Sequence, residues 1–361
     1  MAAGIAEAGA FTLDCEFASE GRYYPELALV QVSWGRTLEP SLATIDPLAV
    51  DPAPVVALVA RPDIATVLHA AQGDLALLAH RFGIEGRGLF DTQIAAAFLG
   101  LGDQVGYAGL AEKLLGLTLD KAMQYTRWLD RPLSHRQLAY ALDDVRHLPR
   151  MAKELEARLL ARGRMPWVLE ESRRLAETSV RRTPPEEAYQ RIGGGRSLDP
   201  RRRSALQGAA EWREQMAREI NKPPSWILKD STLVDVARRL PGSWRDLNGI
   251  VGLSPKWIER HGRDLVHALE QGRLPANDPG FKPRLSAPQA KRAGKLYRLV
   301  EERARTAEVA PRFVISRSDC DALYAAWLEG GEGAVAHLPL FTTWRREVAG
   351  EAALAWLRLS A

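Results

Sequence analysis

The chain has 361 residues, enough for two or three domains, and carries 49 Lys and Arg against 45 Asp and Glu. No apolar run reaches the roughly eighteen residues of a membrane span, and residues 1–10 lack the basic start and apolar core of a signal peptide. Only Cys15 and Cys320 occur, far apart, so neither a disulfide framework nor a zinc site is indicated. We therefore expect a cytoplasmic protein without a membrane partner.

The charge is unevenly distributed along the chain. Residues 1–150 carry 12 Lys and Arg and 18 Asp and Glu, whereas residues 151–361 carry 37 and 27. A basic second half attracts polyanions, and nucleic acid is the polyanion that fits this pattern, although a basic helical surface is often only solvated.

The first 150 residues predict an α/β domain. Helical spacing over 73–83 ends at Gly83, and Asp91 is a good N-cap for the helix that follows it. Strands that alternate with helices indicate a sheet covered by helices. The expected strands are 11–17, 26–34, 42–46, 65–70 and the short segment 88–90.

Two carboxylates stand within the first expected strand, FTLDCEF. Side chains alternate along a strand, so Asp14 and Glu16 share one face while Cys15 points to the other. A divalent cation is the simplest partner that offsets the repulsion of two such acids. An edge strand with one solvated face would show the same alternation, so the pair is weak evidence on its own.

Further acids follow at places that suit such a site. Asp74 stands where the fourth strand gives way to a helix, although an acid there also suits a helix N-terminus. A capping box, Ser134 with Gln137, opens a later helix on which Tyr140 and Asp144 lie four residues apart and project from one side. Asp143 lies three residues from Tyr140, so spacing alone does not decide between Asp143 and Asp144.

Three segments, DCEF, HAAQGDLALL and YALDD, occur in this order and resemble the three motifs of the DEDD superfamily of exonucleases, in the subgroup with Tyr in the third motif. The similarity extends to YYPELALVQV, DTQIAAAFLG and WLDRPLSHRQLAYALDDV, and within the superfamily the chain resembles the ribonuclease D family. The resemblance covers residues 11 to about 160. It implies a ribonuclease H-like fold and a 3′–5′ exoribonuclease activity.

The resemblance assigns roles to five residues. It implies two divalent ions, Mg²⁺ or Mn²⁺, with Asp14 bridging both. Glu16 and Asp144 would hold the ion that activates water, Asp74 would support the other, and Tyr140 would orient the attacking water. Oxygen ligands suit these hard ions.

Two further residues lie near the motifs. Cys15 stands where Thr is common in the family, and because it faces away from the expected metals we expect little effect. Trp128 stacks on a terminal base or anchors its loop, and the anchor is slightly favoured.

The rest of the chain is expected to be all-α. We expect the exonuclease domain over 1–168, a linker over 169–196, a helical domain over 197–275, a second linker over 276–288 and a last helical domain over 289–361. The third of these segments resembles the HRDC domain, a helical nucleic-acid-binding module. The last segment is expected to be a diverged copy of it.

The HRDC-like segment offers candidate RNA contacts. Arg201, Arg202, Lys222 and Lys229 are the basic candidates for phosphate contacts, and a merely solvated face is an equal alternative for each. Its tryptophans are expected to be core residues rather than base-stacking groups, because small helical domains need large apolar fillers. They are Trp212, Trp226, Trp244 and Trp257.

We therefore expect a metal-dependent 3′–5′ exoribonuclease that acts, as is usual in the family, on the 3′ ends of tRNA precursors or other small structured RNAs, as a monomer with no evident protein partner. A DNA 3′–5′ exonuclease is an alternative with the same chemistry. A non-catalytic RNA-binding scaffold is an alternative from another class, and the complete set of acids argues against it.

Overall fold

The computed structural model describes residues 1–119, 126–274 and 285–359. Contacts divide the described chain into two compact units. The first comprises residues 1–17, 27–180 and the helices from 285 onward, and the second comprises residues 18–26 and 181–274. Among the described residues, no helix is long and apolar enough to cross a membrane.

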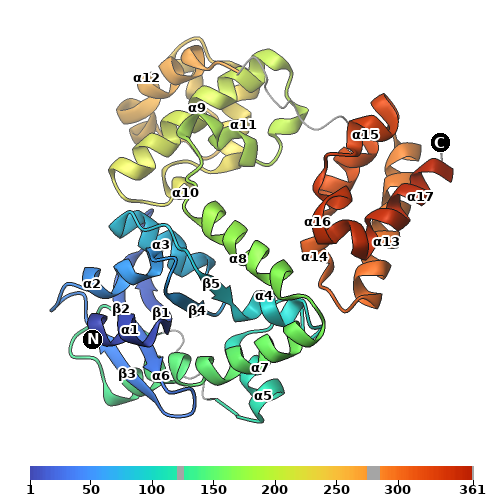
Figure 1. Ribbon diagram of the computed structural model, residues 1–361. Coiled ribbons are helices and arrows are strands. Elements are labelled where there is room, and N and C mark those ends of the chain that lie inside the picture. Colours follow the sequence, from blue (N-terminus) through green and yellow to red (C-terminus); the bar gives the residue numbers. More distant parts are fainter. Residues whose placement is uncertain (120–125, 275–284, 360–361) are drawn as a thin grey trace. The chain divides into compact units, whose positions relative to one another are not determined.

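The first unit contains a five-stranded sheet in the order β3-β2-β1-β4-β5 (Figure 1). β1 pairs with β4 and β4 with β5 in parallel, whereas β2 and β3 are antiparallel. The strands expected from the sequence are all present. Their bounds are β1 Ala10–Ala18, β2 Glu26–Gly35, β3 Pro40–Ile45, β4 Ala65–Leu68 and β5 Leu89–Asp91.

Helices cover both faces of the sheet. Leu13 and its neighbours pack on one face against Ile5 and Leu75, from α1 and α3. On the other face Val145 and Leu148, from the end of α6 and the start of α7, belong to a second core. The helices of this part are α1 Ala2–Ala8, α2 Ala53–Val56, α3 Gln72–Phe82, α4 Thr92–Ala97, α5 Tyr107–Leu115, α6 His135–Arg146, α7 Leu148–Ala161 and α8 Met165–Ser179.

The helices that follow residue 285 belong to this first unit. Phe98 at the end of α4 packs against Phe313 and Trp344, and Trp344 stacks on Trp167 at 5.3 Å. One continuous apolar core therefore joins them to α4 and α8. They are α13 Ala287–Thr306, α14 Pro311–Val314, α15 Arg317–Val335, α16 Thr343–Arg345, the π-helical turn η6 Arg346–Gly350 and α17 Glu351–Leu359.

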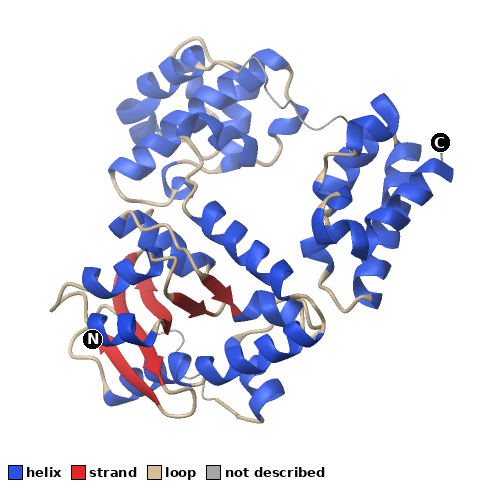
Figure 2. Cartoon of the chain, in the orientation of Figure 1, coloured by secondary structure: helices blue, strands red, loops and turns tan. Residues whose placement is uncertain are grey.

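The second unit has its own apolar core, built around α9 and α12. Its described residues from 181 to 274 are helices, turns and loops (Figure 2). Its longer elements are α9 Pro200–Glu219, α10 Pro224–Ile227, α11 Asp230–Arg239 and α12 Pro255–Gln271. Its short 3₁₀ turns are η2 Pro185–Arg191, η3 Gly195–Ser197 and η4 Trp244–Leu247.

Two expectations about domain organisation need correction. Residues 169–179, expected to open a linker, continue α8, because Glu171, Ser172 and Ala176 are buried on one side of that helix. The last helices do not stand apart as a separate domain, because their core continues into that of the first unit. The remaining boundaries stay predictions, and residues 276–284 of the second expected linker lie outside the described residues.

Candidate active site

Three of the four predicted acids meet at one place. Asp14 and Glu16 project from the same face of β1, and Asp144 reaches them from α6, which packs on that face. One carboxylate oxygen from each lies within 4.8 Å of the others, close enough to hold a metal ion together. Asp143, the competitor in spacing, instead pairs with Arg146 at 2.8 Å.

Asp74 approaches from the opposite face of the sheet. It lies in the first turn of α3 and is buried. Burial raises the pKa of Asp74 most, and the charge of Asp14 raises it further. It is outside the group of three whose oxygens are within 4.8 Å of one another. The four acids therefore form a group of three with a fourth next to Asp14.

The carboxyl groups of this cluster are costly to ionise without a cation. Burial raises the pKa of Asp14 to about 6. Burial and then the charge of Asp14 raise the pKa of Asp144 to about 8, and burial with the neighbouring acids raises that of Glu16 to about 9. A divalent cation would remove this repulsion, and carboxylate oxygens are the donors that hard cations prefer.

Tyr140 lies beside the acids, as its spacing predicts. Its hydroxyl shares a hydrogen bond with Asp144, and burial followed by the charge of Asp144 raises its pKa above the usual value of a tyrosine. Tyr140 is therefore a neutral hydrogen-bond donor and not a base.

The end of α6 that carries Asp144 is held by two hydroxyl groups that sequence reasoning missed. Tyr107, at the start of α5, donates to the carbonyl of Asp143 at 2.6 Å. Ser33 on β2 donates to the carbonyl of Val145 at 3.0 Å, and its hydroxyl lies 2.7 Å from that of Thr12 on β1. The last carbonyls of a helix have no partner inside it, so these two bonds fix the residues on either side of Asp144.

Gln31 performs a similar task for Asp14. Its side-chain amide is buried and donates to Asp14 at 2.5 Å. Gln31 and Ser33 lie two residues apart in the otherwise apolar strand ALVQVSW, so they share a face. Two polar residues on one face of an apolar strand could have indicated these contacts from the sequence, because polar side chains buried in a sheet need hydrogen-bond partners.

The turn before Asp74 is fixed by Asp91. Its carboxylate caps α4 through Gln93 and Ile94, and also accepts from the amides of Ala70 at 3.2 Å and Ala71 at 2.9 Å. The sequence predicted only the cap. This buried acid thus joins the start of α4 to the start of α3.

Cys15 has the predicted orientation, yet it contacts one of the four acids. Its side chain does face away from Asp14, as alternation requires, but α3 packs on that face and brings Asp74 to it. The Cys15 thiol shares a hydrogen bond with Asp74, and burial and that carboxylate raise the pKa of the thiol.

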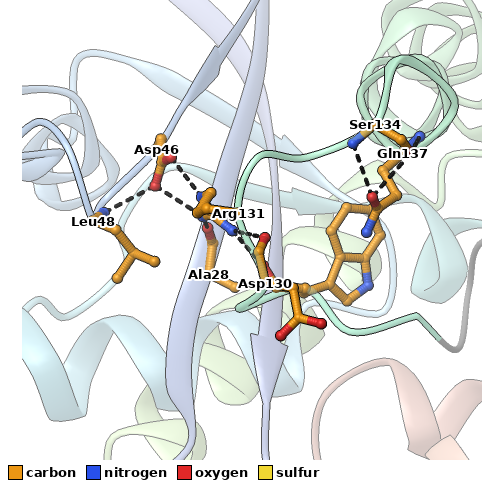
Figure 3. A network of polar contacts seen from close by, with 8 residues as sticks. Ala28, Asp46, Leu48, Asp130, Arg131, Ser134 and Gln137 are labelled. Carbon is orange, nitrogen blue, oxygen red and sulfur yellow. Dashed lines mark hydrogen bonds and ion pairs between the residues drawn. The ribbon is translucent and has the colours of Figure 1, made fainter.

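Trp128 anchors its loop. It is only 5% exposed and packs on Tyr140 with ring centroids 6.1 Å apart, so it offers almost no face to a base. Arg131 holds the same loop by pairing with Asp46 at 2.7 Å and donating to the carbonyls of Ala28 and Trp128, each at 2.7 Å (Figure 3). Arg131 is a further residue that the sequence did not single out.

Of the predicted phosphate contacts, Arg201, Lys222 and Lys229 are exposed in the second unit. Arg202 is engaged with Asp199 at 2.5 Å and with the carbonyl of Arg238 at 2.8 Å.

Known proteins share both parts of this chain. A family model described as 3′-5′ exonuclease matches residues 1–160, and the HRDC domain model matches residues 203–269. Ribonuclease D of Zymomonas mobilis is 36% identical over 97% of this chain and 89% of its own length. The chain belongs to the ribonuclease D family.

Ribonuclease D of Escherichia coli is also similar, at 33% identity over 95% of this chain and 91% of its own. The crystal structure of that enzyme, titled an exoribonuclease involved in structured RNA processing, matches with a TM-score of 0.85 and covers 99% of this chain and 95% of its own, at 32% identity. The present chain is accordingly a 3′–5′ exoribonuclease, a hydrolase of the nuclease class.

Proposed function

We propose that this ribonuclease D trims the 3′ ends of tRNA precursors and other small structured RNAs and releases 5′-mononucleotides. The observation that carries the proposal is the cluster of Asp14, Glu16 and Asp144 with Tyr140 bonded to Asp144. In this proposal the chain works as a monomer in the cytoplasm. The basic second half of the chain supports a polyanionic substrate.

We propose that the site takes two divalent cations, Mg²⁺ or Mn²⁺. The raised pKa values of the cluster support this, since they report carboxylates in need of a cation. Asp14 would contact both ions, Glu16 and Asp144 would hold one, and Asp74 would support the other. Two such ions supply an activated water and neutralise charge on the leaving oxygen.

The protein groups would then orient the reaction. Tyr140 would orient the attacking water by hydrogen bonding, and its raised pKa keeps the proton on its hydroxyl. Gln31 holds one oxygen of Asp14, while Tyr107 and Ser33 fix the helix end that carries Asp144. Such outer partners keep the carboxylates in the positions that metal binding requires.

The test uses a 3′-extended tRNA transcript and a matched single-stranded DNA, both labelled at the 5′ end, with Mg²⁺, with Mn²⁺ and with chelator. We expect stepwise, metal-dependent shortening of the RNA. Shortening of DNA alone would contradict the substrate proposal, and shortening in chelator would contradict the metal proposal.

A matched pair of variants tests the residue assignment. Asp144→Asn should lower the cleavage rate by more than about a hundredfold, because the loss of an outer partner alone costs about 10- to 100-fold. Asp143→Asn, the adjacent exchange outside the cluster, should retain most activity. Equal losses in the two variants would overturn the assignment.

A further inference from the structure

A large aromatic side chain lies open on the surface of the second unit. The sequence predicts Trp226 as a core residue, yet the structure leaves it 65% exposed at the start of the unit's short helix α10. The other tryptophans named with it are partly buried and pack against the core of that unit. The core prediction is therefore wrong for Trp226, and its exposure calls for a partner.

The ring of Trp226 has two close neighbours in its own unit, Lys222 and Gly21. The Lys222 ammonium lies 5.6 Å from the ring centroid, a cation–π contact that fixes the ring's orientation. On another side, a Cβ added at Gly21 would come within 3.0 Å of the outer edge of the ring. Gly21 also has a φ of +66°, so both its backbone and the neighbouring indole favour glycine there.

The loop that contains Gly21 is anchored to the same unit. Asn221 accepts hydrogen bonds from the amides of Tyr23 at 3.1 Å and Tyr24 at 2.9 Å. The Tyr23 hydroxyl donates to Glu214, and it accepts from Arg218 at 3.0 Å. Gly21 is thus placed beside Trp226 by a network of bonds to α9 and to the turn that follows it.

Charge near the ring favours a nucleic acid over an apolar partner. Residues 220–229 contain Lys222 and Lys229, both exposed, and no Asp or Glu. Exposed aromatic rings among cations are the groups on which single-stranded nucleic acids stack, because every base has a π-face and every nucleotide a phosphate.

We propose that Trp226, held between Gly21 and Lys222, is a stacking platform for an unpaired base of the RNA substrate. The proposal rests on RNA as the substrate. Gly21 follows Glu16 by five residues, so the loop beside the platform is a direct continuation of the strand that carries two of the clustered acids. The platform would hold a nucleotide upstream of the 3′ end while the end is cleaved.

The test combines a Trp226→Ala variant with RNAs in which single nucleotides lack their base. Binding of full-length protein to a 3′-extended tRNA is measured by fluorescence anisotropy in chelator, with one abasic position moved along the extension. For the wild type, one position should weaken binding by between about fivefold and about 150-fold. The Trp226→Ala variant should bind the intact RNA more weakly than the wild type by a similar factor. Its affinity should not change further when that position lacks its base.

Two further variants control for unspecific effects. Trp226→Phe should recover part of the affinity, because it restores an aromatic face. Val251→Ala, which shortens another exposed apolar side chain of the same unit, should bind as the wild type does. Wild-type affinity in Trp226→Ala, or the same abasic profile in wild type and variant, would overturn the platform.

Cleavage of a dinucleotide separates this proposal from the proposed function. In the proposal the platform holds a nucleotide upstream of the last two, so Trp226→Ala should cleave a dinucleotide at the wild-type rate. A slower rate would mean that Trp226 acts on the structure of the site and would overturn the platform. If the wild-type protein cleaves neither the dinucleotide nor the RNA, the proposed function is contradicted, whatever the binding data show.

Discussion

The two helical regions that follow the exonuclease part differ in what they stabilise. The helices between 200 and 271 enclose an apolar core of their own. Those between 287 and 359 share a core with α4, α7 and α8, and their Arg345 forms a buried ion pair with Glu171 of α8 at 2.5 Å. The first is a module, whereas the second completes the domain that carries the acids.

We expect this difference to separate chemistry from recognition. The first unit buries ionisable groups, both in the acidic cluster and in the pair of Arg345 with Glu171, and such groups are stable only while their partners stay in place. The second unit displays Trp226 and exposed cations on its surface. Damage to the last helices should therefore reach the exonuclease part, and damage to the module should not.

The largest expected effect comes from removing Arg345. Arg345→Ala leaves Glu171 buried without its closest cation, which should lower the free energy of unfolding of the first unit by about 3–5 kcal/mol. Hydrogen exchange resolved by peptide should rise in α4, α8 and α14 and stay unchanged between 200 and 271. As a control, Arg358→Ala, which breaks an exposed pair with Glu332, should change little. Unchanged exchange in α8 of Arg345→Ala would remove the distinction between the two regions.

The converse substitution is made in the core of the second unit. Leu265 of α12 is fully buried, and Leu265→Ala should lower the free energy of unfolding of the second unit by about 2–5 kcal/mol. Hydrogen exchange should rise between 200 and 271, while cleavage of a dinucleotide keeps its wild-type rate. Loss of dinucleotide cleavage in the folded variant would show that the module is not independent of the exonuclease part.

The acidic cluster should make the stability of the first unit depend on pH and metal. The folded protein holds protons on Asp14, Asp144 and Glu16 up to about pH 6, 8 and 9, whereas an unfolded chain releases them near pH 4. Without metal, stability should therefore fall as pH rises from about 4 to about 9. Bound metal replaces these protons, so the affinity for Mg²⁺ should rise about tenfold per pH unit for each proton displaced.

This dependence is measured as the melting temperature with and without Mg²⁺ at pH 6 and pH 8.5. The rise in melting temperature on adding Mg²⁺ should be larger at pH 8.5 than at pH 6. In Asp144→Asn, this difference between the two pH values should be smaller. A gain that is equal at both pH values would contradict the assignment of the raised pKa values to the metal site.

The smallest expected change in stability comes from Tyr107. Tyr107→Phe removes the hydroxyl that holds the Asp143 carbonyl, which should cost about 1 kcal/mol of unfolding free energy. The same loss should lower kcat while KM for RNA stays close to the wild-type value, because the change displaces Asp144 and no RNA contact. A change confined to KM would argue that Tyr107 contacts the substrate.

Short-range rules made several features of the site predictable. Alternation along β1 put Asp14 and Glu16 on one face, and the capping box at Ser134 set the start of the helix from which Tyr140 and Asp144 project together. These rules act over a few residues, so one sequence suffices. The family resemblance then chose Asp144 over Asp143, which spacing alone left open.

Tertiary structure decided what the rules of local geometry do not reach. Cys15 meets Asp74 because a distant helix packs on its face, and Tyr107 and Ser33 reach the end of α6 from other elements. Trp226 is exposed and the last helices are integrated because burial depends on which surfaces pack together. The sequence by itself determined the acids and the order of elements; long-range packing alone determined their partners, since a side chain's environment is built by residues far from it in the chain.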